Sequence, residues 1–145
     1  MILGHQVFVH GGLLDRRDFL VLNLLTMEWT LMADFGFPKD GIYDGISDHA
    51  MAPGSNSEII VLGGTDGVGN TYPCRPFSEV KVFDVKKGKW RDEEPLPAEI
   101  LGGKTTLTNH HLIEISREGG AWIVCLGGRN DDSHPNHLLL LDISY

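Results

Sequence analysis

The sequence contains few cysteines and no long hydrophobic run. Its two cysteines, Cys74 and Cys125, stand in unlike surroundings, the first close to prolines and the second within the apolar run 121–126. This difference favours free thiols in a reducing compartment over a structural disulfide. No apolar run reaches the roughly 18 residues that a membrane span needs, and the first residues lack the basic and apolar segments of an export signal. We therefore expect a cytoplasmic protein.

Basic residues are also scarce. The chain has 12 Lys and Arg against 20 Asp and Glu, which gives a formal net charge of −8. An acidic surface repels phosphate backbones and anionic lipid headgroups, so neither nucleic acid nor a membrane is expected as a partner. The hydrophobic share of 41% is enough for an ordered core, and a length of 145 residues corresponds to an ordinary domain.

Glycine, by contrast, is abundant, with 18 residues, and part of this excess belongs to an internal repeat. Three apolar runs end in a Gly-Gly pair, and the second glycines of these pairs are Gly12, Gly64 and Gly128. The intervals between them are 52 and 64 residues. A fixed order of features at such intervals is typical of a protein built from repeated structural units.

A second apolar run follows each Gly-Gly pair after a polar loop, and it ends in an Asn or Asp that we call the anchor. The anchors are Asn23, Asp84 and Asp142. A tryptophan stands six residues beyond each of the first two anchors, at Trp29 and Trp90. The short runs, rich in β-branched and aromatic residues and separated by Gly, Asp and Asn, predict strands rather than helices. A continuous run such as 59–62 indicates a strand that is buried on both faces.

The order of Gly-Gly pair, anchor and tryptophan resembles the kelch repeat of the galactose oxidase and kelch-like propellers, a four-stranded β-propeller blade of about 50 residues. The resemblance implies an all-β fold made of about three kelch-type blades, an incomplete propeller. The expected copies cover about 1–37, 45–97 and 103–145, with the first and the last truncated.

The family pattern also assigns the strands of each blade. The Gly-Gly pair ends the second strand, the anchor ends the third, and the tryptophan leads into an outer fourth strand at or near 30–33 and 91–94. Inner first strands are expected near 47–52 and 105–115, whereas the first copy is expected to begin almost directly at its second strand. The Gly- and Pro-containing segment 65–78 is expected to be an irregular loop rather than strand.

The loops that follow the Gly-Gly pairs are the best candidates for a binding surface. In propellers these loops gather at one end of the blades, and loops on a rigid scaffold are the usual place for recognition. The resemblance implies that an arginine directly after the pair binds acidic peptide side chains, a task that suits the bidentate guanidinium group. The candidate residues are Arg16, Arg17, Asp66, Tyr72, Arg75, Arg129, Asn130 and Asp131.

Histidines invite a metal hypothesis, which the spacing supports only weakly. His134 and His137 next to Asp131 and Asp132 are suitable zinc donors, but a solvated loop explains them more simply. His110 and the residue after it would point to opposite faces of a strand, so they cannot easily share one ion. No metal or cofactor is therefore expected.

A catalytic group is equally hard to assemble from the sequence. Ser47, Asp48 and His49 have the residue types of a triad, but the members of a triad meet through the fold rather than as neighbours in sequence. A copper-radical site needs a Tyr–Cys crosslink with further ligands, and Tyr72 and Cys74, two residues apart in one loop, do not supply it. We therefore expect a protein that is not an enzyme.

The leading hypothesis is a kelch-repeat adaptor or scaffold that binds a protein or peptide through its inter-strand loops. The alternative is a fragment of a kelch-like propeller enzyme, such as a metal-dependent oxidase, a sugar epimerase or a specifier-type protein. A propeller appended to a larger enzyme or to a ubiquitin-ligase adaptor is a third reading. Because closed propellers need about four to eight blades, three copies call for self-association or for the remainder of a larger propeller.

Overall fold

A computed structural model describes residues 1–11, 18–34, 48–54, 57–66, 75–76, 80–91, 108–118, 120–129 and 138–144 of the chain. Within these ranges the chain forms antiparallel β-sheets and contains no α-helix. Correspondingly, the described part of the chain includes no helix with the length and apolar character that crossing a membrane requires. The expected all-β fold of kelch-type blades is confirmed.

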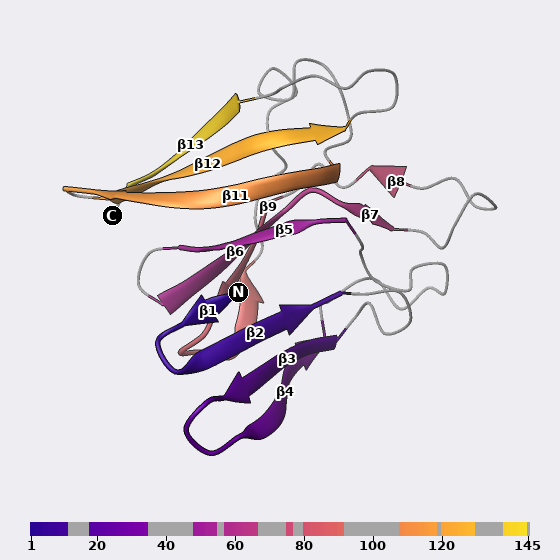
Figure 1. The fold of residues 1–145 in the computed structure, drawn as a ribbon, viewed down its shortest axis with the longest axis vertical. Coiled ribbons are helices and arrows are strands. Elements are labelled where there is room, and N and C mark those ends of the chain that lie inside the picture. The colour runs from indigo at the N-terminus through magenta and orange to yellow at the C-terminus, as the bar shows by residue number, and fades with distance from the viewer. Residues whose placement is uncertain are drawn as a thin grey trace.

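Three sheets lie side by side, each with its strands in the order of a blade (Figure 1). The first sheet contains β1 (Ile2–Leu3), β2 (Gln6–His10), β3 (Asp18–Asn23) and β4 (Glu28–Asp34). The middle sheet contains β5 (Ala50–Pro53), β6 (Glu58–Leu62), β9 (Val80–Asp84) and β10 (Lys89–Arg91). The last sheet contains β11 (Thr108–Arg117), β12 (Gly120–Arg129) and β13 (Leu138–Ser144).

The structure refines one expectation about these strands and corrects another. The first copy has a short inner strand before its second strand, because Ile2 and Leu3 pair with Val7 and Gln6. The segment 65–78 is not entirely irregular. Its two ends form a small pair of strands, β7 (Thr65–Asp66) and β8 (Arg75–Pro76), since backbone pairing satisfies polar groups that a loop would expose.

The anchor residues act as caps of the turns that connect the third and fourth strands. The Oδ1 atom of Asn23 accepts a hydrogen bond from the backbone N–H of Leu25 at 2.9 Å, and Oδ1 of Asp84 accepts one from Lys87 at 3.0 Å. Hydrogen bonding to Lys87, the largest cause, also lowers the pKa of Asp84. Short side chains that bind the backbone two or three residues ahead favour turns, which explains why an Asn or Asp recurs here.

Backbone conformation explains why glycine occupies the first position of each Gly-Gly pair. The first glycine of each pair has a positive φ: 74° at Gly11, 67° at Gly63 and 72° at Gly127. A Cβ added at Gly127 would meet no atom within 4 Å, so a close approach of neighbouring atoms is not the reason for glycine there. The left-handed conformation itself requires the residue without a side chain.

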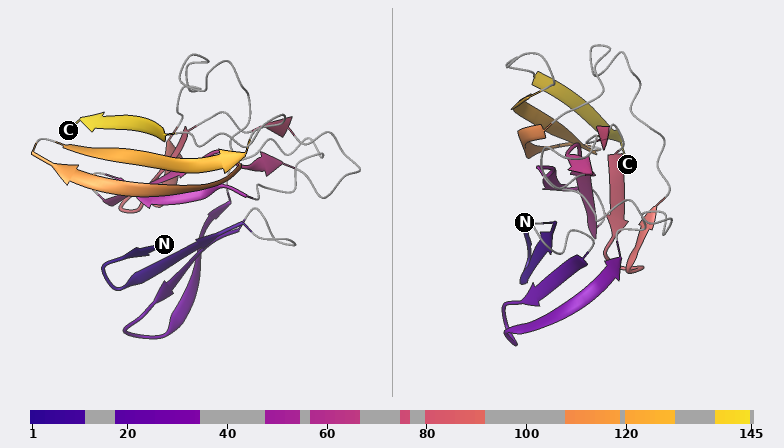
Figure 2. Two further views of the ribbon diagram at one scale, coloured as in Figure 1. Left: turned by 45° about the horizontal axis from the view of Figure 1, so that its top comes forward. Right: turned by 90° about the vertical axis from the view of Figure 1, so that its right-hand side faces the viewer.

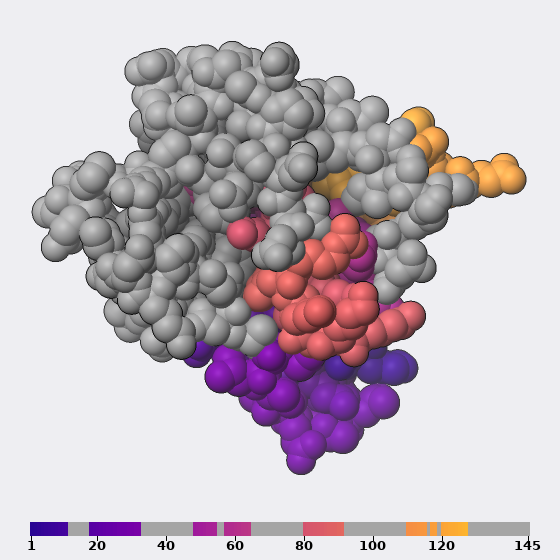
Figure 3. All heavy atoms as spheres, turned by 180° about the vertical axis from the view of Figure 1, so that it is seen from behind, coloured from indigo at the N-terminus to yellow at the C-terminus, as the bar shows by residue number. Residues whose placement is uncertain are grey.

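The core consists of two layers, one on each side of the middle sheet. Strand β6 contributes to both, because successive side chains of a strand point to opposite faces. Its Ile59 and Val61 pack with Phe8 and Phe19 of the first sheet, and its Ile60 packs toward Ile123 of the last sheet. The continuous apolar run 59–62 is therefore buried on both faces, as expected. From behind, the surface of residues 80–91 lies against that of residues 18–34 (Figure 3).

Candidate functional site at the Gly-Gly end of the sheets

The second strand of each sheet ends at the same end of the molecule, which we call the Gly-Gly end. Strands β2 and β12 point toward it, and β7 and β8 extend beyond the middle sheet there (Figures 1 and 2). The turns 24–27 and 85–88 lie at the opposite end, because β3 and β9 run antiparallel to β2 and β6. Loops from all three sheets therefore begin on one side of the molecule.

Three candidate binding residues lie on described strands at this end. Asp66 of β7 and Arg75 of β8 are direct cross-strand partners, and Arg129 is the last residue of β12. Pairing of β7 with β8 thus brings together two residues that are nine positions apart in the sequence. The remaining candidates fall outside the described residues: Arg16, Arg17, Tyr72, Asn130 and Asp131.

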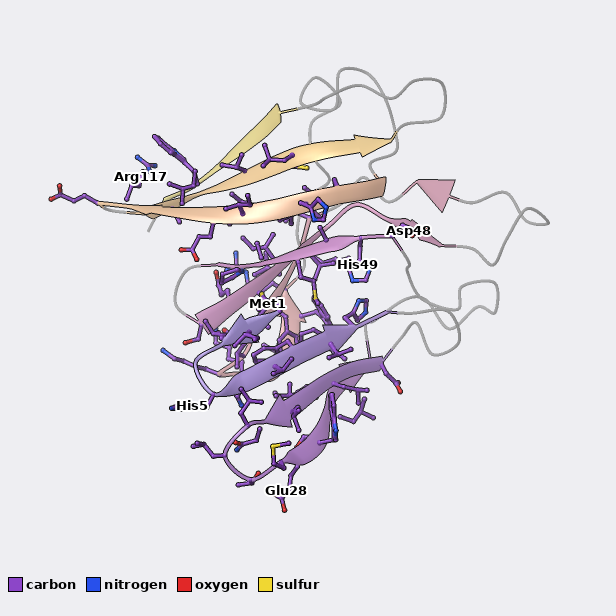
Figure 4. All side chains as sticks on the ribbon, viewed as in Figure 1. Met1, His5, Glu28, Asp48, His49 and Arg117 are labelled. Atoms are coloured by element: carbon purple, nitrogen blue, oxygen red, sulfur yellow. The ribbon has the colours of Figure 1, made fainter. Side chains whose placement is uncertain are left out.

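A cluster of two buried histidines, His10 and His110, and the half-buried His49 lies near the Gly-Gly end, and the sequence did not single it out as a group. His10 ends β2, His49 precedes β5, and His110 belongs to β11, so each sheet contributes one imidazole. The Nδ1 atom of His10 lies 3.1 Å from Nε2 of His49, with ring centroids 4.8 Å apart. Figure 4 shows the His49 side chain between β5 and β2. The signal for His10 was present in the repeat, because Leu62 and Leu126 occupy the same position before the glycines.

Burial keeps these imidazoles neutral. Loss of hydration lowers the pKa of His10 from 6.5 to about 3, with a smaller contribution from His49. Burial likewise lowers the pKa of His49 to about 4, and that of His110 to about 4. Because neutral imidazole has one donor and one acceptor nitrogen, the His10–His49 contact is a hydrogen bond between two uncharged rings.

Aromatic rings from the first and middle sheets pack beside His10. The His10 ring centroid lies 5.8 Å from that of Phe19 and 6.1 Å from that of Trp90. Trp90 in turn packs 5.3 Å from Phe19 and 5.0 Å from Phe83. The base of the Gly-Gly end is therefore a packed seam between the first and middle sheets.

The described residues offer little for catalysis or metal binding. Within the described ranges, no group of three or more His, Cys, Asp or Glu side chains is placed to hold a metal ion. His110 is buried whereas His111 is exposed, as their adjacent positions on a strand predict. Cys125 is buried and free, and burial raises the pKa of its thiol to about 11, which disfavours the nucleophilic thiolate.

Two sequence hypotheses about chemistry lie partly or wholly outside the described residues. Ser47 is not described, so the proposed Ser-Asp-His neighbours can be judged only from Asp48, which is exposed, and His49, which binds His10. The His134 and His137 segment with its neighbouring aspartates also lies outside the described ranges.

The three sheets share a strand order, and Gly-Gly pairs and anchor residues lie at or near the ends of their strands. These shared features define a protein built from repeated β-sheets of the propeller-blade type. Residues 52–97 match the family model of the Kelch motif. This stretch runs from β5 through β10 and includes the second Gly-Gly pair, the anchor Asp84 and Trp90. This part of the chain is therefore similar to a kelch repeat. A comparison with curated proteins found no match to the chain.

Proposed function

We propose that the chain is a protein-interaction module, without enzymatic activity, that binds a protein or peptide partner at the Gly-Gly end. The kelch motif supports a module of this general kind, because kelch repeats commonly mediate protein interactions. The observation that carries the proposal is the placement of Asp66, Arg75 and Arg129 on strand ends that project from one side of the sheets.

Rigid support beneath the loops favours recognition. The histidine pair and the surrounding aromatic rings lock the first sheet to the middle sheet directly below the Gly-Gly end. A rigid base lowers the entropy that is lost when loops order around a partner.

The partner is expected to present acidic side chains to the arginines. A guanidinium group binds carboxylates through two parallel hydrogen bonds, which gives both affinity and orientation. The net charge of −8 opposes such a partner at long range, so the arginines must supply the attraction locally.

The test is affinity capture with a triple variant, Arg16→Ala, Arg75→Ala and Arg129→Ala, compared with the unaltered chain. A matched control removes three cations from the opposite end: Lys86→Ala, Lys89→Ala and Arg117→Ala. We expect the first variant to lose the partners that the unaltered chain captures, and the control to keep them. Equal capture by both variants would overturn the proposal, as would stoichiometric copper or iron in the purified protein.

A further inference from the structure

The outward face of the first sheet is mainly apolar where its side chains are described, with Asp18 at one edge as a polar exception. Cross-strand partners share a face of a sheet, and the pairings Ile2–Val7–Leu22–Trp29 and Val9–Leu20–Leu31 form two such rows. Several members are strongly exposed, including Trp29 at 56% and Leu31 at 60%. Contiguous exposed apolar surface of this kind marks a site of association.

The middle sheet shows how a face of this kind is covered. Trp29 and Trp90 each stand six residues after an anchor, and each is paired across strands with the residue before that anchor, Leu22 and Phe83 respectively. Trp90 packs on Phe19 of the preceding sheet, whereas Trp29 faces away from the described sheets. The open face of the first sheet is thus equivalent to the face that the middle sheet presents to its predecessor.

The last sheet has the complementary open face. Ile113 and Ile115 of β11 and Leu126 of β12 are 47%, 46% and 39% exposed, whereas Cys125, the strand neighbour of Leu126 on the other face, is fully buried. Leu126 occupies the position of Leu62, directly before a Gly-Gly pair. Leu62 packs against Cys125 of the last sheet. The exposed face of the last sheet is therefore equivalent to the face of the middle sheet that packs on the last sheet.

We propose that two copies of this chain associate head to tail, with the outward face of the first sheet in one copy covering that of the last sheet in the other. Each copy carries both of the surfaces that meet, and their contact repeats the interfaces found within one chain. This inference concerns the sides of the sheets and is independent of the partner-binding role proposed for the Gly-Gly end.

Two copies are also the number that covers every open face. A head-to-tail interface generates either a ring or an open polymer, and a ring leaves no apolar face in water. Six sheets fall within the range of about four to eight blades that closed propellers use. One contact between the two copies follows from the contact of Leu62 with Cys125 within one chain. Counted from the Gly-Gly pairs, Leu126 is equivalent to Leu62, and Val9 is equivalent to Cys125. Leu126 of one copy should therefore contact Val9 of the other.

Mass measurement in solution, by light scattering or sedimentation, tests the proposal on the unaltered chain. The expected mass is twice the 16.0 kDa of one chain. Leu31→Glu on the first sheet and Ile113→Glu on the last should each halve the mass. Leu25→Glu, at a turn residue that is 71% exposed and lies off both faces, is the matched control and should leave the mass unchanged.

These outcomes separate head-to-tail association from its alternatives. All three positions are exposed in a single chain, so the circular dichroism of the variants should remain that of the unaltered protein. A folded monomer over the whole concentration range would overturn the proposal and would point to coverage by further repeats. An open polymer, or a dimer that only one of the two face variants disrupts, would equally contradict it.

Crosslinking provides a second measurement that does not depend on weakening the interface. The double variant Val9→Cys and Leu126→Cys should form covalent dimers under a mild oxidant. Each single variant should yield no more covalent dimer than the unaltered chain, because the head-to-tail arrangement keeps identical positions of the two copies apart. Covalent dimers of a single variant, or none of the double variant, would overturn the proposed contact.

Discussion

The imidazoles of His10 and His49 join the first sheet to the middle sheet through a contact of 3.1 Å between Nδ1 and Nε2. The two residues are separated by 39 positions and belong to different repeats. Both rings are shielded from water, and the seam beside them is closed by Phe19 and Trp90. The protonation of these two histidines therefore affects the contact between two repeats.

Stability should fall as the solution is acidified below neutral pH. The pKa values of His10, His49 and His110 are lowered from 6.5 to about 3, 4 and 4 in the folded chain. The unfolded chain thus takes up protons first, so the stabilisation is complete above an ordinary histidine pKa and is lost as the pH falls toward the folded values. From pH 7.5 to 5.5, each histidine should cost about 1 kcal/mol of unfolding free energy. Urea denaturation over this pH range measures the loss.

The double variant His10→Leu and His49→Leu should flatten this pH dependence. Leucine already stands at the position of His10 in the other repeats, at Leu62 and Leu126, so the fold accommodates it. His111→Gln, at an exposed neighbour of His110, is the control and should keep the original slope. A double variant with the slope of the unaltered chain would show that these histidines are not the source.

Met27 should be a point of stored backbone strain. It has a φ of 60° and stands four residues after its anchor, where the middle repeat has Gly88 with a φ of 64°. Side chains disfavour this left-handed conformation, so Met27→Gly should stabilise the chain by about 1 kcal/mol. Chemical denaturation checks the value. Gly88→Met should destabilise by a similar amount, because no atom lies within 4 Å of the added Cβ and only the conformation opposes it. No change in either variant would refute the strain.

Phe19 should be a principal contributor to the contact between the first and middle sheets. Its side chain is fully buried and packs 4.6 Å from Phe83 and 5.3 Å from Trp90, measured between ring centroids. Phe19→Ala should lower the unfolding free energy by about 3 to 5 kcal/mol. The same truncation at the exposed Leu25 should have little effect. A loss at Phe19 no greater than that at Leu25 would mean that the two sheets do not share a core.

The repeat made much of this fold predictable from the sequence. Gly-Gly pairs and anchors mark strand ends through local backbone requirements, so β2, β6 and β12, with their successors β3, β9 and β13, fall where the pattern indicates. The inner strands β5 and β11 also lie near their expected positions. Of the expected outer strand 91–94, only Arg91 is described, and it lies in β10 with Trp90.

The features that the sequence did not reveal depend on contacts between repeats or on backbone pairing without a local signal. β1 is only two residues long, and β7 and β8 lie in a segment rich in Gly and Pro, so no apolar run marks them. The histidine cluster combines one residue from each of three sheets, a proximity that only stacking creates. Asp66 and Arg75 were chosen as separate loop residues, whereas their strand pairing makes them neighbours.

Hydrogen exchange with and without a captured partner tests the central claim that this chain binds through its Gly-Gly end. We expect slowed exchange of amides in the segments that follow the three Gly-Gly pairs, 12–18, 64–80 and 128–138. Exchange at the opposite turns, 24–27 and 85–88, should stay the same. Protection of those turns, with the segments after the Gly-Gly pairs unaffected, would show that the partner binds elsewhere.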